Sequence, residues 1–214
     1  MPVQVITPPA PIVTPADIPG NHAADDSKIA AMIAAVTEDI DGPGGWLGRS
    51  LGKQTLELTL GHADKDCPLK PFPPREISLR YIPVIADAVT VKYLDLDEAV
   101  QTVDPANYKV FDDAVWFNSD FVFPAVADAP DAIRIRYDAG YGGSGNNGAV
   151  PERAKQTIIL CVQDLMRLQA SDFAVRSETV EGVGSTNYLD QDRVSAIVEK
   201  TCERLLARLW VPIL

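Results

Sequence analysis

The change from strand to helix falls within residues 133–165, which read IRIRYDAGYGGSGNNGAVPERAKQTIILCVQDL. At the start of this stretch Ile133, Ile135 and Tyr137 alternate with polar residues, a period of two that is typical of a strand with one buried face. A glycine-rich loop follows, and Pro151 then suits the first turn of a helix, where no N–H is needed. Apolar residues after it recur at helical spacing, which indicates one apolar helix face. The stretch therefore predicts a sheet that leads directly into a helix.

Both patterns occur again on the two sides of this stretch. Between residues 54 and 137, short runs of β-branched and aromatic residues alternate with polar residues, and prolines separate the runs. This region is typical of a half-buried antiparallel sheet, with a hairpin turn at Asp112-Asp113-Ala114. Residues 29–40, preceded by an acidic N-cap, and residues 194–209 have helical spacing. The order of helix, strands and helices predicts an α+β fold.

The predicted architecture is a helical bundle body that carries an inserted antiparallel β-sheet. Its segments are an extended proline-rich N-terminal arm (1–20), the first part of the helical body (21–53), a β-rich insertion (54–149), the second part of the body (150–208) and an apolar C-terminal tail (209–214). The proline density of the arm favours polyproline-like extended chain over helix or interior strand.

Composition narrows the possible functions. Of 214 residues, 30 are acidic and 19 basic, so the net charge is −11, and 46% are hydrophobic. This composition predicts a globular chain, and it argues against a protein that neutralises nucleic-acid phosphates or a basic membrane surface. No apolar run approaches a transmembrane length, no signal peptide is expected, and three widely spaced cysteines favour reduced thiols.

Two motifs suggest enzymes, but their surroundings do not support catalysis. Residues 48–52 match the G-x-S-x-G nucleophile elbow around Ser50, but His22 lies upstream and His62 follows too soon for the expected chain order. Gly140, Gly142 and Gly145 match a dinucleotide fingerprint, but the expected helix opens only after Pro151, and no second strand with an acid follows. We therefore expect a non-enzymatic chain without a cofactor and keep a Ser50 hydrolase as an alternative.

Candidate metal ligands are incomplete. Asp95, Asp97 and Glu98 lack the glycine and distal glutamate of a calcium loop, so a solvated turn is favoured. His62 and Cys67 supply two ligands where structural zinc needs four. We expect no metal site.

The two apolar ends are the candidate binding sites. The C-terminal set is Leu209, Trp210, Val211, Pro212, Ile213 and Leu214. This end either completes the chain's own core or fills a partner's pocket, where each large side chain would contribute roughly 1.5–3 kcal/mol. The N-terminal set, either frayed or ordered against a neighbouring subunit or neck protein, is Val3, Val5, Ile6, Ile12 and Val13.

Four stretches carry a likeness to known proteins. They are IVT at 12–14 leading into IAAMIAAV at 29–36; LGRSLGKQTLE at 47–57; ISL, IPV and VTVKY between 77 and 93; and IRYDAGYG with VPERAKQTI between 135 and 158. In this order they resemble the head–tail connector proteins, or portal adaptors, of long-tailed phages and gene transfer agents. The second stretch is similar to the family's "gR-x-L-x-x-Q-T" run into a strand.

This resemblance implies a structural role in the virion neck. It implies a homo-oligomeric ring, a dodecamer in the virion, bound below the portal protein and offering a platform for stopper or tail-terminator proteins. The family's C-terminal segment reaches into the portal, and DNA passes through the lumen without being read, so the acidic charge would suit a lumen that does not hold DNA. Synthesis in the bacterial host cytoplasm and no membrane contact are also implied. A tail-completion or head-closure protein of the neck is the alternative.

Overall fold

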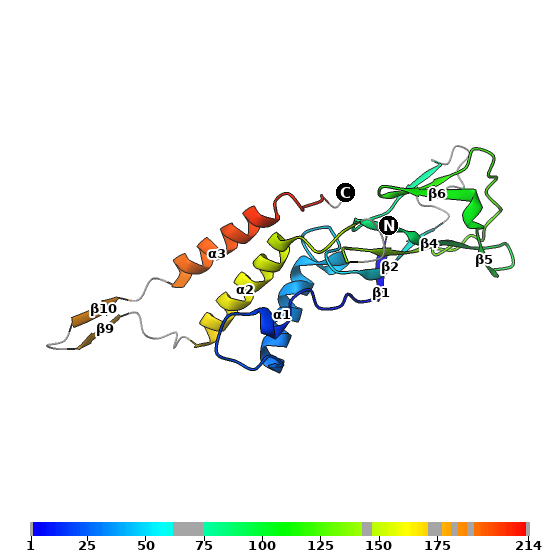
Figure 1. Cartoon of the computed structure of the whole chain (residues 1–214). Coiled ribbons are helices and arrows are strands. Elements are labelled where there is room, and N and C mark those ends of the chain that lie inside the picture. Colours follow the sequence, from blue (N-terminus) through cyan, green and yellow to red (C-terminus); the bar gives the residue numbers. More distant parts are fainter. Residues whose placement is uncertain are drawn as a thin grey trace. The chain divides into compact units, whose positions relative to one another are not determined.

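The computed structural model describes residues 2–61, 75–142, 147–170, 177–180, 184–187 and 191–212. Its contacts divide the chain into two compact units. The sheet unit comprises Met1–Ala10, Asp41–Val150 and Val211–Leu214, and the helix unit comprises Pro11–Ile40 and Pro151–Trp210. The mixture of helices and antiparallel sheets confirms the predicted α+β class (Figure 1).

A five-stranded antiparallel sheet is the centre of the sheet unit. Its spatial order is β1 (Val3–Thr7), β2 (Gln54–Leu60), β8 (Ile133–Ala139), β4 (Val84–Leu94) and β5 (Val100–Thr102). Along β2 and β8 every second side chain is buried, and Leu58 lies opposite Ile135. The period of two in the sequence therefore identified these two strands and their buried faces correctly.

A second sheet lies in the same unit. Its order is β3 (Glu76–Ser78), β7 (Ala114–Phe117) and β6 (Tyr108–Phe111). The hairpin predicted between β6 and β7 is confirmed, and Asp112 in its turn has a φ of 55°. Buried side chains of β2, β8 and β4 join those of this sheet in one apolar core.

The N-terminal arm differs from its prediction. Residues Val3–Thr7 form β1, an edge strand paired antiparallel with β2, rather than polyproline-like chain. Pro2 and Pro8 flank the strand and do not interrupt it. Because an edge strand needs hydrogen bonds on one side only, such flanking prolines are compatible with it.

The helix unit contains α1 (Ser27–Ile40), α2 (Glu152–Ala170) and α3 (Gln191–Leu206). The Asp26 carboxylate accepts the backbone N–H groups of Lys28 at 2.8 Å and Ile29 at 3.3 Å, which confirms the acidic N-cap of α1. Both α1 and α3 pack on α2, which lies between them and runs in the opposite direction (Figure 1).

Short elements connect these helices and strands. They are the 3₁₀ turns η1 (Pro15–Asp17), η2 (Gly42–Gly44) and η3 (Pro105–Asn107), and a hairpin of β9 (Ser177–Val180) with β10 (Gly184–Asn187) between α2 and α3.

Candidate functional site

The C-terminal segment begins inside the core, and Pro212, its last described residue, is exposed. The N–H groups of Leu209 and Trp210 donate to the Leu206 carbonyl at 2.7 and 3.1 Å, so a tight turn closes α3. Leu206 is fully buried and Leu209 is 9% exposed. These two leucines therefore fill the protein's own core, which sequence reasoning allowed as one of two alternatives for this end.

The residues after Leu209 are more accessible. Trp210 is 54% exposed, and Pro212 is also exposed. The Val211 N–H donates to the Leu47 carbonyl at 3.0 Å, which fixes the backbone of this half-buried residue. Ile213 and Leu214 lie outside the described residues. Of the predicted tail contacts, Trp210 thus offers the largest described apolar surface.

The N-terminal contact residues fall into two groups. Val5 and Ile6 on β1 are 44% and 41% exposed, while Val3 and Ile12 are half-buried. Val13 is only 2% exposed and belongs to the core. Val5 and Ile6 are therefore the residues of this set with the most surface to offer a neighbour.

A buried carboxylate organises the loop that precedes β2. Asp41 is 7% exposed, and its side chain accepts the N–H groups of Leu51 at 2.6 Å and Gly52 at 3.1 Å and the Gln54 amide at 3.2 Å. Burial raises the pKa of Asp41, and these hydrogen bonds oppose the rise. Sequence reasoning missed this residue, because its donors lie ten or more positions away and local spacing gives no sign of them.

The elbow-like motif at residues 48–52 supplies two of the N–H groups that bind this carboxylate, those of Leu51 and Gly52. The motif lies between η2 and β2, without the strand and helix that an elbow needs. Ser50 is fully buried, and its hydroxyl has no hydrogen-bond partner in the described structure. His22 lies beside the Ile18 carbonyl at 2.8 Å, and His62 lies outside the described residues. The described structure brings no histidine to Ser50.

The glycine motif provides close backbone contact. Gly140 has a φ of +109°, and a Cβ there would lie 2.1 Å from the Gly52 carbonyl oxygen. The Tyr141 N–H donates to the Leu51 carbonyl at 3.0 Å, and the Tyr141 hydroxyl accepts from Arg49 at 2.9 Å. The glycine is thus required for packing against residues 49–52, whereas Gly145 lies outside the described residues.

The remaining candidate ligands do not assemble. Asp95 accepts two backbone N–H groups and the Gln101 amide, which lower its pKa and make it the centre of a turn. Within the described ranges, no group of three His, Cys, Asp or Glu side chains could hold a metal ion. Cys67, like His62, is not among the described residues.

Two cysteines meet in the helix unit. The Cys161 and Cys202 sulfurs lie 3.4 Å apart as free thiols on α2 and α3. Burial raises the pKa of Cys161 to about 12 and also raises that of Cys202. These thiols, half-buried at Cys161 and buried at Cys202, therefore have little thiolate character.

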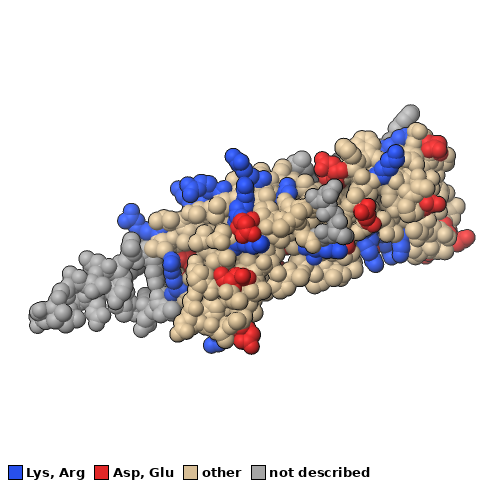
Figure 2. Space-filling model, in the orientation of Figure 1, with Lys and Arg blue, Asp and Glu red and all other residues tan. Residues whose placement is uncertain are grey.

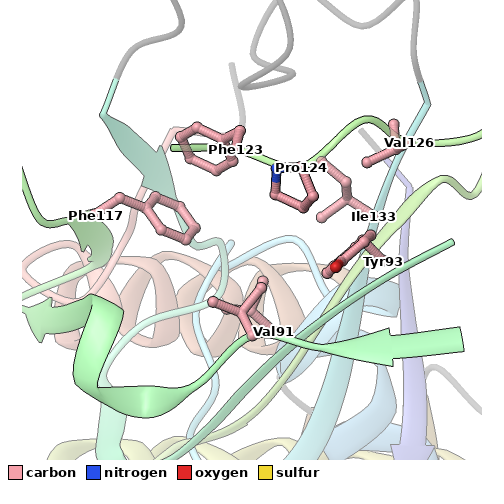
Figure 3. A pocket seen from close by; sticks show the side chains of 8 residues that line it. Val91, Tyr93, Phe117, Phe123, Pro124, Val126 and Ile133 are labelled. Carbon is pink, nitrogen blue, oxygen red and sulfur yellow. The ribbon is translucent and has the colours of Figure 1, made fainter. Parts of the chain in front are cut away.

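One apolar hollow opens beside the core of the sheet unit. Its lining includes Val91 and Tyr93 of β4, Phe117 of β7, and Phe123 (Figure 3). Its lining residues include no carboxylate, histidine, cysteine or serine, and the one hydroxyl among them is that of Tyr93. The ring of Phe117 packs edge-on against Phe123 with centroids 4.6 Å apart.

Charge is distributed unevenly in the helix unit. Lys and Arg side chains gather along the part of the molecule where α3 is drawn (Figure 2). On α3, Arg193, Lys200 and Arg204 are exposed, and none of the ion pairs found among the described residues includes them. This basic face contrasts with the net charge of −11 for the whole chain.

Comparison with known proteins gives matches only among solved structures. No protein-family model and no curated protein matches the chain. A chain of the structure "Neck of native GTA particle computed with C12 symmetry" is similar, with a TM-score of 0.60, 14% identity, and coverage of 100% of this chain and 98% of that one. A chain of "Neck of empty GTA particle computed with C6 symmetry" gives 0.57 and 15%, with the same coverage.

A third structure, "Virion of native gene transfer agent (GTA) particle", contains a similar chain with a TM-score of 0.55, 16% identity and coverage of 100% and 98%. The likeness therefore extends over the whole length of both chains. It shows that this protein has the fold of a component of gene transfer agent particles.

Among the helices of the described residues, none combines the length and the apolar character of a membrane span.

Proposed function

We propose that this chain is a non-enzymatic structural protein of a virion neck, a head–tail connector subunit that forms a ring below the portal. The observation that carries the proposal is the full-length fold likeness to chains of gene transfer agent particles, two of them from neck structures. The head–tail connector resemblance of the four sequence stretches points to the same place independently of the fold.

In this proposal each part of the chain has a task. The helices α1, α2 and α3 form the bundle body of the subunit, and residues 54–149 are its β-rich insertion. Copies assemble into a closed ring, for which we propose twelve, and DNA passes through the lumen without sequence-specific contact. The side of the ring that faces away from the portal binds stopper or tail-terminator proteins. The neck structures with similar chains were computed with C12 and C6 symmetry, which supports a ring.

We assign portal binding to residues 210–214. Trp210 is 54% exposed, and Ile213 and Leu214 follow it in the sequence. Burying three such side chains would contribute roughly 4–9 kcal/mol before the cost of ordering the tail is subtracted. A ring would engage many tails at once, so a modest contribution from each would give stable attachment. Leu209 is buried in the subunit and serves as the anchor from which the tail leaves.

Co-sedimentation with purified portal rings tests this function. We compare the full chain with a variant that ends at Leu209, which keeps the buried leucines in place. Trp210→Ala is the single-residue version, and Trp116→Ala, at a tryptophan that is 43% exposed on β7, is the matched control. The full chain and the control should co-sediment, and the other two variants should lose binding.

Equal co-sedimentation of the truncated variant would refute the tail assignment. Failure of the full chain to bind portals, together with binding to tail components, would favour a tail-completion or head-closure protein instead.

A further inference from the structure

The exposed face of α3 carries a basic stripe with an isoleucine inside it. Arg193, Ile197, Lys200 and Arg204 follow one another at intervals of four, three and four residues, so they lie within an arc of about 60° on the helix. All are exposed, and Ile197 is 66% exposed. Lys200 and Arg204 repel each other at this spacing, because like charges four residues apart destabilise a helix. Glu203, three residues after Lys200, offsets part of this repulsion, and the three basic side chains remain on an open face.

The exposed face of α1 has complementary chemistry. It is formed by Ala31, Ala34, Ala35 and Glu38. The helix carries Lys28 in its first turn and Glu38 and Asp39 near its end, where the helix dipole disfavours negative charge and no basic residue compensates. Small side chains let another helix approach closely. Basic side chains of another molecule would stabilise the acidic end of α1.

These two faces lie at opposite edges of one layer. Both α1 and α3 pack on α2, which lies between them (Figure 1). Each edge helix thus turns one face inward and leaves the other exposed. A contact between the α3 edge of one molecule and the α1 edge of another would continue the layer, and it would be heterologous, since different surfaces meet. Heterologous contacts close into rings when the rotation per copy allows it.

We propose that the basic stripe of α3 binds the exposed face of α1 on the next copy of this chain, and that this contact closes the ring. The inference rests on the proposed ring and names its interface. With Ile197 over Ala35, Lys200 lies level with Glu38, because both charged residues follow three positions, or about 4.5 Å, further along their helices. Within one unit both α1 and α3 run opposite to α2, which fits this parallel pairing (Figure 1).

A second copy fits the stripe better than DNA does. On a phosphate backbone the exposed Ile197 would find no apolar partner, whereas the alanine surface of α1 would bury it. Glu199 and Glu203 lie beside the stripe on the same helix and would repel a phosphate backbone. The acidic end of α1, with exposed Glu38 and Asp39, gives another copy a local face of opposite charge.

A charge-swap experiment on the full chain tests the interface. We would measure the assembly of wild type, Lys200→Glu, Glu38→Lys and the variant with both changes, by light scattering and electron microscopy, alone and with portal rings. Lys109→Glu, an exposed lysine on β6, is the matched control, and circular dichroism verifies the fold of each variant. Because like charges then face each other, each single swap should raise the concentration at half-assembly about tenfold or more. The double swap should restore assembly, and the control should match wild type.

The possible results separate the α3–α1 interface, the ring itself and DNA binding from one another. Rings that persist in both single variants would overturn this interface and leave the proposed ring intact. Wild type that forms no ring, alone or on portals, would overturn the ring and the interface together, while the co-sedimentation test would still report portal binding. Fluorescence anisotropy with a DNA duplex provides the third result: DNA binding by wild type that Lys200→Glu abolishes would assign the stripe to DNA instead.

Discussion

Replacing Asp41 with alanine should destabilise the protein strongly. The carboxylate accepts the N–H groups of Leu51 at 2.6 Å and Gly52 at 3.1 Å and the Gln54 amide at 3.2 Å, at a site where Asp41 is 7% exposed. In Asp41→Ala the two backbone donors stay buried without their acceptor, at about 1–3 kcal/mol each. Removing a carboxylate whose burial is unfavourable offsets part of this loss. We expect a decrease of about 2–4 kcal/mol in the free energy of unfolding.

Urea unfolding followed by tryptophan fluorescence measures this change. Asp97→Ala is the matched control, because Asp97 is an exposed aspartate in a turn, and this control should change stability by less than about 0.5 kcal/mol. Asp41→Asn adds a graded test, since its amide keeps one acceptor but places an NH₂ group against a donor. Its stability should lie between those of wild type and Asp41→Ala.

A stability of Asp41→Ala within about 0.5 kcal/mol of wild type, the usual range for surface substitutions, would contradict this role of Asp41. It would mean that the Leu51 and Gly52 donors find other acceptors, and that Asp41 does not hold the loop in place.

Three further predictions follow from the buried groups. Ser50→Ala should leave the free energy of unfolding unchanged or raise it by up to about 1 kcal/mol, because the buried hydroxyl has no partner; a clear loss of stability, or an esterase activity that the substitution abolishes, would contradict this. Gly140→Ala should lower stability by about 3 kcal/mol or more in the same urea assay, since a Cβ would lie 2.1 Å from the Gly52 carbonyl oxygen at a φ of +109°. Cys161 and Cys202 should resist iodoacetamide at pH 8 until urea unfolds the chain, because burial raises both thiol pKa values, that of Cys161 to about 12; mass spectrometry showing rapid labelling of either in the folded protein would refute it.

Local patterns predicted the three helices and several of the strands correctly, among them β2, β6, β7 and β8. The alternation around Leu58 and Ile135 identified strands because burial on one face repeats every second residue. The N-cap at Asp26 could be predicted from the sequence, because a cap binds N–H groups only two or three residues away. These interactions lie within a few residues of one another, so the sequence order alone contains them.

Contacts between residues far apart in the chain could not be predicted from the sequence pattern. Asp41 finds its hydrogen-bond donors only after the loop at residues 42–52 folds back over it. Gly140 must be a glycine because the Gly52 carbonyl, far away in the sequence, leaves no room for a side chain. The proline-rich arm became strand β1 because β2 supplies its partner, which composition does not show. At the C-terminus, apolar character was evident, but the boundary between buried Leu209 and exposed Trp210 depends on how α3 ends.

Electron microscopy of the full chain mixed with purified portal rings would image the proposed connector ring itself. We expect a closed ring of this chain stacked coaxially on the portal, with the C-terminal segment that follows Leu209 inserted between portal subunits. Portal particles without an added ring, or a ring whose C-terminal segments point away from the portal, would contradict it.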